Sequence, residues 1–205
     1  MAYLTEQEKD RIAAAICDVE ARTTGELVTV IAQASDDYSF IPALWAALVA
    51  FAVPGLAVVL GLSTEVLEVS VAQLAVFCVL VLLGRWRPLR YRLVPTGIKK
   101  ARAARLAREQ FFARGVRETE ERTGILIFVS VAERHVEILA DSGINRKVDP
   151  DVWRKAVDLF VGNVKAGRVA DGFLAAIAEC GAVLTEHFPC SDKNPDELPN
   201  RLFEL

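Results

Sequence analysis

Carboxylate and amide side chains follow two of the strands predicted from this sequence, and together they could bind a divalent cation. Asp36 and Asp37 come shortly after a buried strand predicted over residues 27–32, and Asp141 directly follows another predicted strand. Ligands collect at the carboxyl ends of parallel strands in open α/β sheets. Oxygen donors suit Ca²⁺ or Mg²⁺, so we predict a binding site for one of these cations. We predict no organic cofactor. The candidate metal ligands are Asp36, Asp37, Asp141, Asn145 and Asp149.

Each of these residues also has a purely structural interpretation. Asp149 precedes Pro150, and an aspartate before a proline is typical of the N-cap of a helix. Asp36 and Asp37 stand just before a long apolar stretch. As polar residues at the water-facing end of a membrane segment, they need no further role. The sequence leaves both interpretations open.

A phosphatase could use the pair Arg134-His135, with the histidine as nucleophile or acid and the arginine holding the phosphoryl oxygens. The same pair fits a solvent-facing hairpin turn. The chain has no D-x-D-x-T run, no C-x5-R loop, no R-H-G triplet and no Walker glycine loop. We therefore assign no catalytic residue.

Two apolar stretches over residues 41–62 and 66–84 predict a membrane hairpin inserted in a soluble domain. Each is close to the roughly 20 residues that a helix needs to cross the hydrocarbon core of a bilayer. The alternative is a pair of buried core helices, but the remainder of a 205-residue chain offers little soluble mass to cover them. The stretch begins too far into the chain to be a cleavable signal peptide.

The charges around the apolar stretches predict their orientation. Residues 85–108 carry nine basic side chains and no acidic one, whereas the short connection at 63–68 holds only Glu65 and Glu68 as charged residues. Basic residues favour the cytoplasmic side. We therefore predict a two-helix protein of the cell membrane, in bacteria the inner membrane, with both termini cytoplasmic. The basic run from Arg85 to Arg108 would bind anionic lipid headgroups. Nucleic acid is the alternative partner, which the net charge of −3 disfavours.

The soluble residues predict one small α/β domain around the hairpin. A helix beginning at a Thr5–Glu8 capping box precedes the first strand, and a helix over 101–116 precedes strands at 125–131 and 136–140. The intervening helix favours parallel pairing of the first two strands, and the short break favours an antiparallel third strand. The predicted fold is a three-layer α/β/α small mixed sheet interrupted by a two-helix transmembrane hairpin. Its parts are residues 1–40, the hairpin 41–84, the remainder of the domain 85–188 and a flexible tail 189–205.

The sequence resembles the TPM domain family in its strand-forming segments. The likeness is carried by Thr24-Gly25-Glu26-Leu27-Val28 and by the run of residues 123–138, TGILIFVSVAERHVEI. It continues through Gly143-Ile144, Asp149 and the break at Lys165-Ala166-Gly167. The family is sometimes labelled a phosphatase and includes thylakoid proteins linked to photosystem II repair. The resemblance implies a three-layer α/β/α fold, and similarity to weak acid phosphatases or calcium-binding proteins. This chain has Asn145 where the family usually has an acidic residue, and Ser142 in place of an aromatic one.

Two functions follow as hypotheses. The first is a membrane-anchored TPM-like module that docks on a membrane protein and supports assembly or quality control, with a bound divalent cation. The alternative is a metal-assisted acid phosphatase that acts on phosphate esters. The missing catalytic signature favours the first.

Overall fold

The computed structural model describes residues 3–62, 65–190 and 197–205. The chain divides into two compact units. The sheet unit consists of residues 1–35 and 102–205, and the hairpin unit of residues 36–101. The predicted tip of the hairpin at 63–64 and the part of the predicted tail at 191–196 lie outside the described residues.

A four-stranded mixed sheet in the order β3-β2-β1-β4 forms the centre of the sheet unit. β1 pairs in parallel with both β2 and β4, whereas β2 and β3 form an antiparallel hairpin. The parallel pairing of the first two strands and the antiparallel third strand are therefore confirmed. The strands are β1 (Glu26–Ala32), β2 (Gly124–Ser130), β3 (His135–Ala140) and β4 (Leu202–Glu204).

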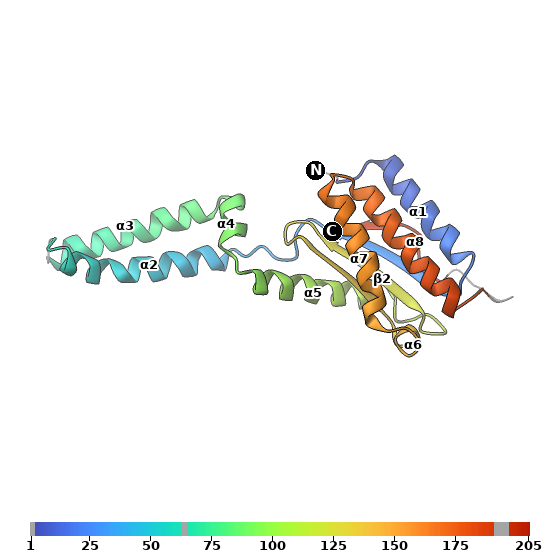
Figure 1. Ribbon diagram of the computed structural model, residues 1–205. Coiled ribbons are helices and arrows are strands. Elements are labelled where there is room, and N and C mark those ends of the chain that lie inside the picture. The colour runs from blue at the N-terminus through green and yellow to red at the C-terminus, as the bar shows by residue number, and fades with distance from the viewer. Residues whose placement is uncertain (1–2, 63–64, 191–196) are drawn as a thin grey trace. The chain divides into compact units, whose positions relative to one another are not determined.

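Helices cover both faces of this sheet, which confirms the three-layer α/β/α prediction (Figure 1). One core cluster joins Leu27 and Ile31 of β1 to the helices on one face, and the other joins Val28 and Val30 to α5. Because both faces of β1 are buried, its residues are apolar almost without interruption. The helices on the first face are α1 (Glu6–Glu20), α7 (Trp153–Lys165) and α8 (Val169–His187), and α5 spans Thr96–Ala113.

Two glycines of the TPM-like pattern allow backbone segments to approach closely. A Cβ atom at Gly124 would lie 2.2 Å from the carbonyl oxygen of Val116, and one at Gly143 would lie 2.4 Å from that of Glu121. Gly143 also donates its backbone N–H to the carbonyl of Arg122, at 2.9 Å. The contacts of Gly143 hold the short helix α6 (Ser142–Asn145) against the turn that precedes β2.

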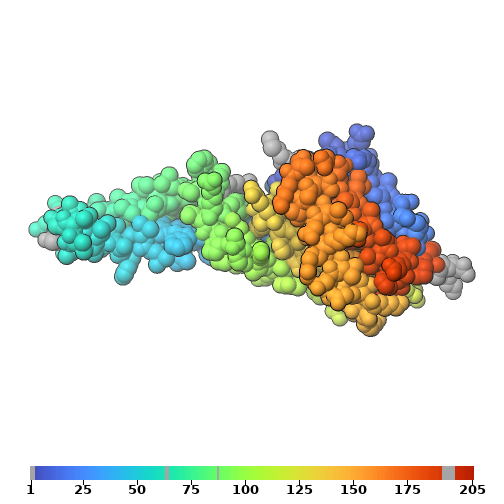
Figure 2. All heavy atoms as spheres, viewed as in Figure 1, coloured from blue at the N-terminus to red at the C-terminus, as the bar shows by residue number. Residues whose placement is uncertain are grey.

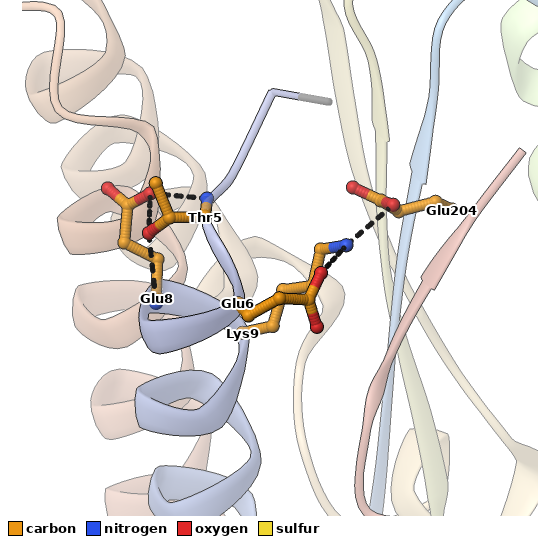
Figure 3. Close-up of polar contacts among 5 residues, drawn as sticks. All are labelled: Thr5, Glu6, Glu8, Lys9 and Glu204. Carbon is orange, nitrogen blue, oxygen red and sulfur yellow. Dashed lines mark hydrogen bonds and ion pairs between the residues drawn. The ribbon is translucent and has the colours of Figure 1, made fainter. Parts of the chain in front are cut away.

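The chain's last residues form a strand in a segment that we predicted to be a flexible tail. β4 pairs with β1, and the backbone N–H of Leu205 donates to the carbonyl of Ile31 at 2.9 Å. Lys9 of α1 lies 2.9 Å from Glu204 and also contacts Glu6 (Figure 3). The pairing satisfies backbone groups on an edge of β1 that would otherwise remain open.

The hairpin unit contains two long helices, α2 (Phe40–Val59) and α3 (Val66–Gly84), which lie side by side (Figure 1). A short helix, α4 (Arg87–Leu93), follows them. At the base, Tyr38, Ile41 and Val94 form a small buried cluster, with the Tyr91 ring edge-on to that of Tyr38 at 5.6 Å. The unit therefore extends beyond the predicted hairpin 41–84, because the residues on either side of it pack together at its base.

A glycine lies where α2 and α3 meet at this base. A Cβ atom at Gly84 would lie 2.4 Å from the Cβ of Pro42. The end of α3 can therefore approach the start of α2 only because residue 84 has no side chain.

Candidate functional site

The antiparallel direction of β3 places the predicted site residues at opposite edges of the sheet. β1 and β2 both end where Ala32 pairs with Ser130, and β3 begins at that edge. β3 ends where Ala140 pairs with Ile125, close to the starts of β1 and β2. Asp141 consequently lies at the amino-end edge of the parallel strands, whereas the segment leading to Asp36 leaves from the carboxyl-end edge.

Three polar side chains, two of them buried and that of Ser35 half-buried, form a network at the carboxyl-end edge. The hydroxyl of Ser130 hydrogen-bonds to the Glu133 carboxylate, and it lies 2.8 Å from the hydroxyl of Ser35. Both carboxylate oxygens of Glu133 accept from the backbone N–H of Ser35, at 3.1 Å. The groups satisfy one another as buried polar groups require, and they fix the segment that leaves β1.

Sequence reasoning missed Ser130 and Glu133 of this network. A serine that ends an otherwise apolar strand, three residues before a glutamate, is the signal that could have found the pair. The spacing places Ser130 at the end of β2 and Glu133 in the tight turn that follows.

A second polar group surrounds Asp141 at the amino-end edge. The Asp141 carboxylate is almost fully buried, caps α6 through the backbone N–H of Ser142 at 2.6 Å, and lies 3.0 Å from Nε of Arg122. Asn145 donates its side-chain amide to the carbonyl of Ala140 at 2.7 Å. Asp141 and Asn145 are therefore near one another, and each already has a structural partner.

The remaining predicted ligands have structural partners elsewhere. Asp149 caps the 3-10 turn η1 (Pro150–Val152) by accepting from the backbone N–H of Asp151 at 2.8 Å, as the N-cap interpretation requires. In the hairpin unit, Asp36 accepts from the backbone N–H of Tyr38 at 3.1 Å. Asp37 forms an ion pair with Arg90, which also donates to the carbonyl of Asp37 at 2.9 Å.

The geometry does not bring the five predicted metal ligands together. Asp141 and Asn145 belong to one edge of the sheet unit, and Asp36 and Asp37 to the hairpin unit. Across residues 3–62, 65–190 and 197–205, no group of three or more His, Cys, Asp or Glu side chains could hold a metal ion. Metal binding at these five residues therefore stays a prediction, and the described residues show no group of side chains that would carry it.

The Arg134-His135 pair lies in the β2–β3 turn and at the start of β3. His135 Nε2 is 2.9 Å from the Glu137 carboxylate, two residues along the same strand, and Arg134 adopts a positive φ of 51°. This arrangement matches the hairpin-turn interpretation.

Many side chains of α2 and α3 lie on the surface of the hairpin unit (Figure 2), and most of the exposed ones are apolar. α2 and α3 are 20 and 19 residues long, and both are long and apolar enough to cross a membrane. No residue in the most apolar 18-residue window of α3 is buried. Phe51 and Val59 are each 82% exposed and Leu67 is 76% exposed. Contiguous apolar surface on this scale marks an interaction with a membrane or a partner.

Comparisons with known proteins support the resemblance to the TPM domain. The family model of the TPM domain matches residues 92–183, which include β2, β3, α7 and most of α8. A protein called BA42 from the psychrophilic bacterium Bizionia argentinensis, solved by NMR, has a similar structure with a TM-score of 0.62 and 20% sequence identity. The similarity covers 100% of this chain and 97% of BA42. Among curated proteins, none matches the sequence significantly. The resemblance to the TPM domain family is confirmed, and the likeness to BA42 supports the fold.

Proposed function

We propose that this protein is a TPM-domain module anchored in a membrane by α2 and α3, where it binds a membrane protein and supports its assembly or quality control. The exposure of α3 carries the proposal. A helix with an apolar surface on every side and no buried residue in its most apolar window has no core to join within its own unit. The hydrocarbon core of a bilayer removes such an apolar surface from water without any further protein.

The length and the base of the hairpin support this placement. Helices of 20 and 19 residues span about 30 Å, which is the thickness of the hydrocarbon core. Gly84 and Pro42 bring the two helices together at the base, and the ion pair between Asp37 and Arg90 lies beside it. Charged pairs fit the water-facing end of a membrane hairpin. The exposed Arg85 and Arg92 next to it suit anionic headgroups.

An interaction role fits the polar residues better than a catalytic one. The candidates that could have acted on a phosphate ester are engaged structurally: His135 with Glu137, Asp149 as a helix cap and Asp37 with Arg90. The metal-assisted phosphatase hypothesis therefore has no described residues that would carry its chemistry.

The membrane anchor can be tested by introducing arginine at two positions of α3, one near its middle and one near its end. Leu74 and Leu67 are both exposed, and only Leu74 lies near the middle of the helix. An arginine at the centre of a membrane helix costs about 2.5–3.5 kcal/mol on insertion, whereas near the interface the cost is small. Leu74→Arg should therefore reduce the fraction of the chain that resists extraction with alkaline carbonate, and Leu67→Arg should leave it nearly unchanged. Equal behaviour of the two variants would contradict the anchor, because a water-exposed helix tolerates both.

The partner can be tested in the same membranes. A photo-crosslinking residue at Val79, an exposed position of α3, should yield a discrete protein adduct in native membranes. Adducts with lipid alone, from Val79 and from every other exposed position of α2 and α3, would contradict docking through the hairpin.

A further inference from the structure

An open groove lies between the end of α2 and the start of α3 in the hairpin unit. It has a volume of about 280 Å³ and includes residues from both helices. Every residue of its lining is apolar except Glu68. The groove therefore combines an apolar surface with a single acidic side chain.

The apolar part of the groove suits the packing of another helix. Ala57 and Ala72 are small, so a helix that lies over them can approach the backbones of α2 and α3 closely. Leu56 and Leu60 belong to the same lining and are 56% and 61% exposed, so their side chains are available to pack against an occupant. Within a bilayer, helices associate through close packing of this kind.

Glu68 places a negative charge in this lining. It lies in the first turn of α3 and is exposed, and within the described parts of the chain it has neither a hydrogen bond nor an ion pair. Water and the positive end of the helix dipole can stabilise the carboxylate while the groove is open. A helix packed over the groove would remove part of this water, and a charge that loses water requires an opposite charge. The occupant should therefore carry a positive charge.

The charges of the chain argue against a second copy as this occupant. Residues 41–84 contain no lysine, arginine or histidine. A copy inserted in the same orientation would place its own Glu68 at the same depth, and its basic run at 85–108 follows the opposite end of α3. A phospholipid is also disfavoured, because its phosphate and the Glu68 carboxylate repel each other. A different protein remains as the source of the positive charge.

We propose that this groove binds a transmembrane helix of a partner membrane protein, and that this helix carries a lysine or arginine at the end beside Glu68. The proposal rests on the membrane-anchored function proposed above, and it names the docking surface and the chemistry of the partner. Long basic side chains near the end of a membrane helix extend to the interface, where the first turn of α3 would lie. In the predicted orientation this is the non-cytoplasmic side, where basic residues are uncommon. The charge would therefore distinguish the partner from most other transmembrane helices.

Photo-crosslinking of the full chain in phosphatidylcholine vesicles tests the proposal. The photoreactive residue replaces either Leu56 in the groove or Val58, which is 68% exposed on the same helix and does not belong to the lining. The probe is a synthetic transmembrane peptide of leucine and alanine with a single lysine at one end. Leu56 should yield an adduct with this peptide, and Val58 should yield much less.

A double-mutant cycle isolates the charge pair. Glu68→Gln should lower the adduct yield from Leu56 about fivefold with the lysine peptide, and should have no effect with a peptide that carries glutamine in place of the lysine. The matched control is Glu65→Gln, because Glu65 is exposed in the same connection and lies outside the lining. This control should retain the yield of the unaltered chain.

The outcomes separate the groove from the membrane anchor. Equal yields from Leu56 and Val58, or equal yields with the lysine and glutamine peptides, would overturn the proposal. Adducts with lipid alone would assign the groove to an acyl chain and would overturn it as well. Extraction of the same vesicles with alkaline carbonate measures the anchor separately. A chain that is retained but does not crosslink to the peptide contradicts the groove proposal alone, whereas release of the chain contradicts both proposals.

Discussion

A single buried thiol gives the sheet unit a pH-dependent stability. Cys180 of α8 is fully buried, and this burial, with a smaller effect of Glu179, raises the pKa of its thiol from 9.0 to about 12. The unfolded chain therefore loses this proton first as the pH rises. The resulting stability is fully present below pH 9 and is lost between about pH 9 and pH 12, by at most about 1.4 kcal/mol per pH unit.

Cys180→Ala should remove this part of the alkaline destabilisation. Urea unfolding followed by circular dichroism at pH 8 and pH 10 should show a smaller loss of stability for the variant than for the unaltered chain. Parallel losses in the two proteins would contradict the burial argument. Other groups, including Lys9, titrate in the unaltered chain and in the variant alike, so their effect on stability cancels when the two proteins are compared.

Asp141 and Asp149 provide a matched pair of helix-capping aspartates. Asp141 is buried beside Arg122, whereas Asp149 is exposed. Loss of an N-cap costs about 1 kcal/mol, and at Asp141 the loss also leaves Arg122 without its charge partner. Asp141→Ala should therefore lower the free energy of unfolding by about 2–3 kcal/mol, and Asp149→Ala by about 1 kcal/mol or less.

Alkylation of Cys180 during urea unfolding measures the free energy of unfolding of the Asp141→Ala and Asp149→Ala variants. The other three cysteines are replaced by serine in all the proteins compared. The buried thiol becomes reactive only when the sheet unit opens. Equal costs for the two variants would show that the Arg122 contact adds nothing to the cap.

The candidate site shows where residue-level prediction succeeds and fails. The N-cap at Asp149 depends on neighbours in the sequence, so Asp-Pro was sufficient to predict it. We grouped Asp141 with residues that follow a parallel strand, although the antiparallel direction that we also predicted for β3 places Asp141 at the amino-end edge of the sheet. Arg122 and Glu133 were missed because each acquires its role from a partner brought close by the folded chain.

At the scale of elements, local signals define the start of α1. The backbone N–H of Thr5 donates to Glu8 at 2.8 Å, and the N–H of Glu8 donates to the Thr5 hydroxyl at 3.3 Å (Figure 3). The Thr5 backbone hydrogen bond lowers the pKa of Glu8 from 4.5. The stability that the ionised Glu8 adds to the folded state is present above pH 4.5. It is lost as the pH falls through the pKa of Glu8 in the folded state.

Thr5→Ala should destabilise the protein by about 1 kcal/mol at pH 7, and Thr5→Ser, which retains the hydroxyl, by much less. Thermal unfolding at pH 7 and pH 3.5 measures the difference. The gap between the two variants should narrow as the pH falls below 4.5 through the lowered pKa of Glu8 in the folded state, because protonation of Glu8 weakens the capping box. A gap that is independent of pH would assign the effect to the Thr5 hydroxyl alone.

Elements with strong local patterns were predicted, and those made by tertiary contact were not. β1, β2 and β3 have apolar runs bounded by turn residues, and Gly115 and Gly167 end their helices with positive φ values of 69° and 77°. β4 has three residues and no such run. It is a strand because β1 offers an open edge, which the sequence of residues 202–204 does not indicate.

At the scale of the whole molecule, the inserted hairpin makes a prediction about topology that does not depend on the sheet unit. Nine basic residues follow α3 over residues 85–108, and Glu65 and Glu68 are the charged residues of the short connection at 63–68. Basic residues remain on the cytoplasmic side of a membrane. Because a hairpin crosses twice, Cys17 and Cys190, which flank it in the sequence, should then both be cytoplasmic.

Single-cysteine variants and a membrane-impermeant maleimide test this arrangement. In right-side-out spheroplasts, Cys17 and Cys190 should remain unlabelled, and in inside-out vesicles both should react, because both side chains are exposed. Cys78, on the exposed surface of α3, should react in neither preparation and should react once detergent replaces the bilayer. Labelling of Cys17 in spheroplasts would reverse the topology. Labelling of Cys78 in both preparations would show that α3 is exposed to water and not shielded by a bilayer. That result would contradict the proposed membrane anchor.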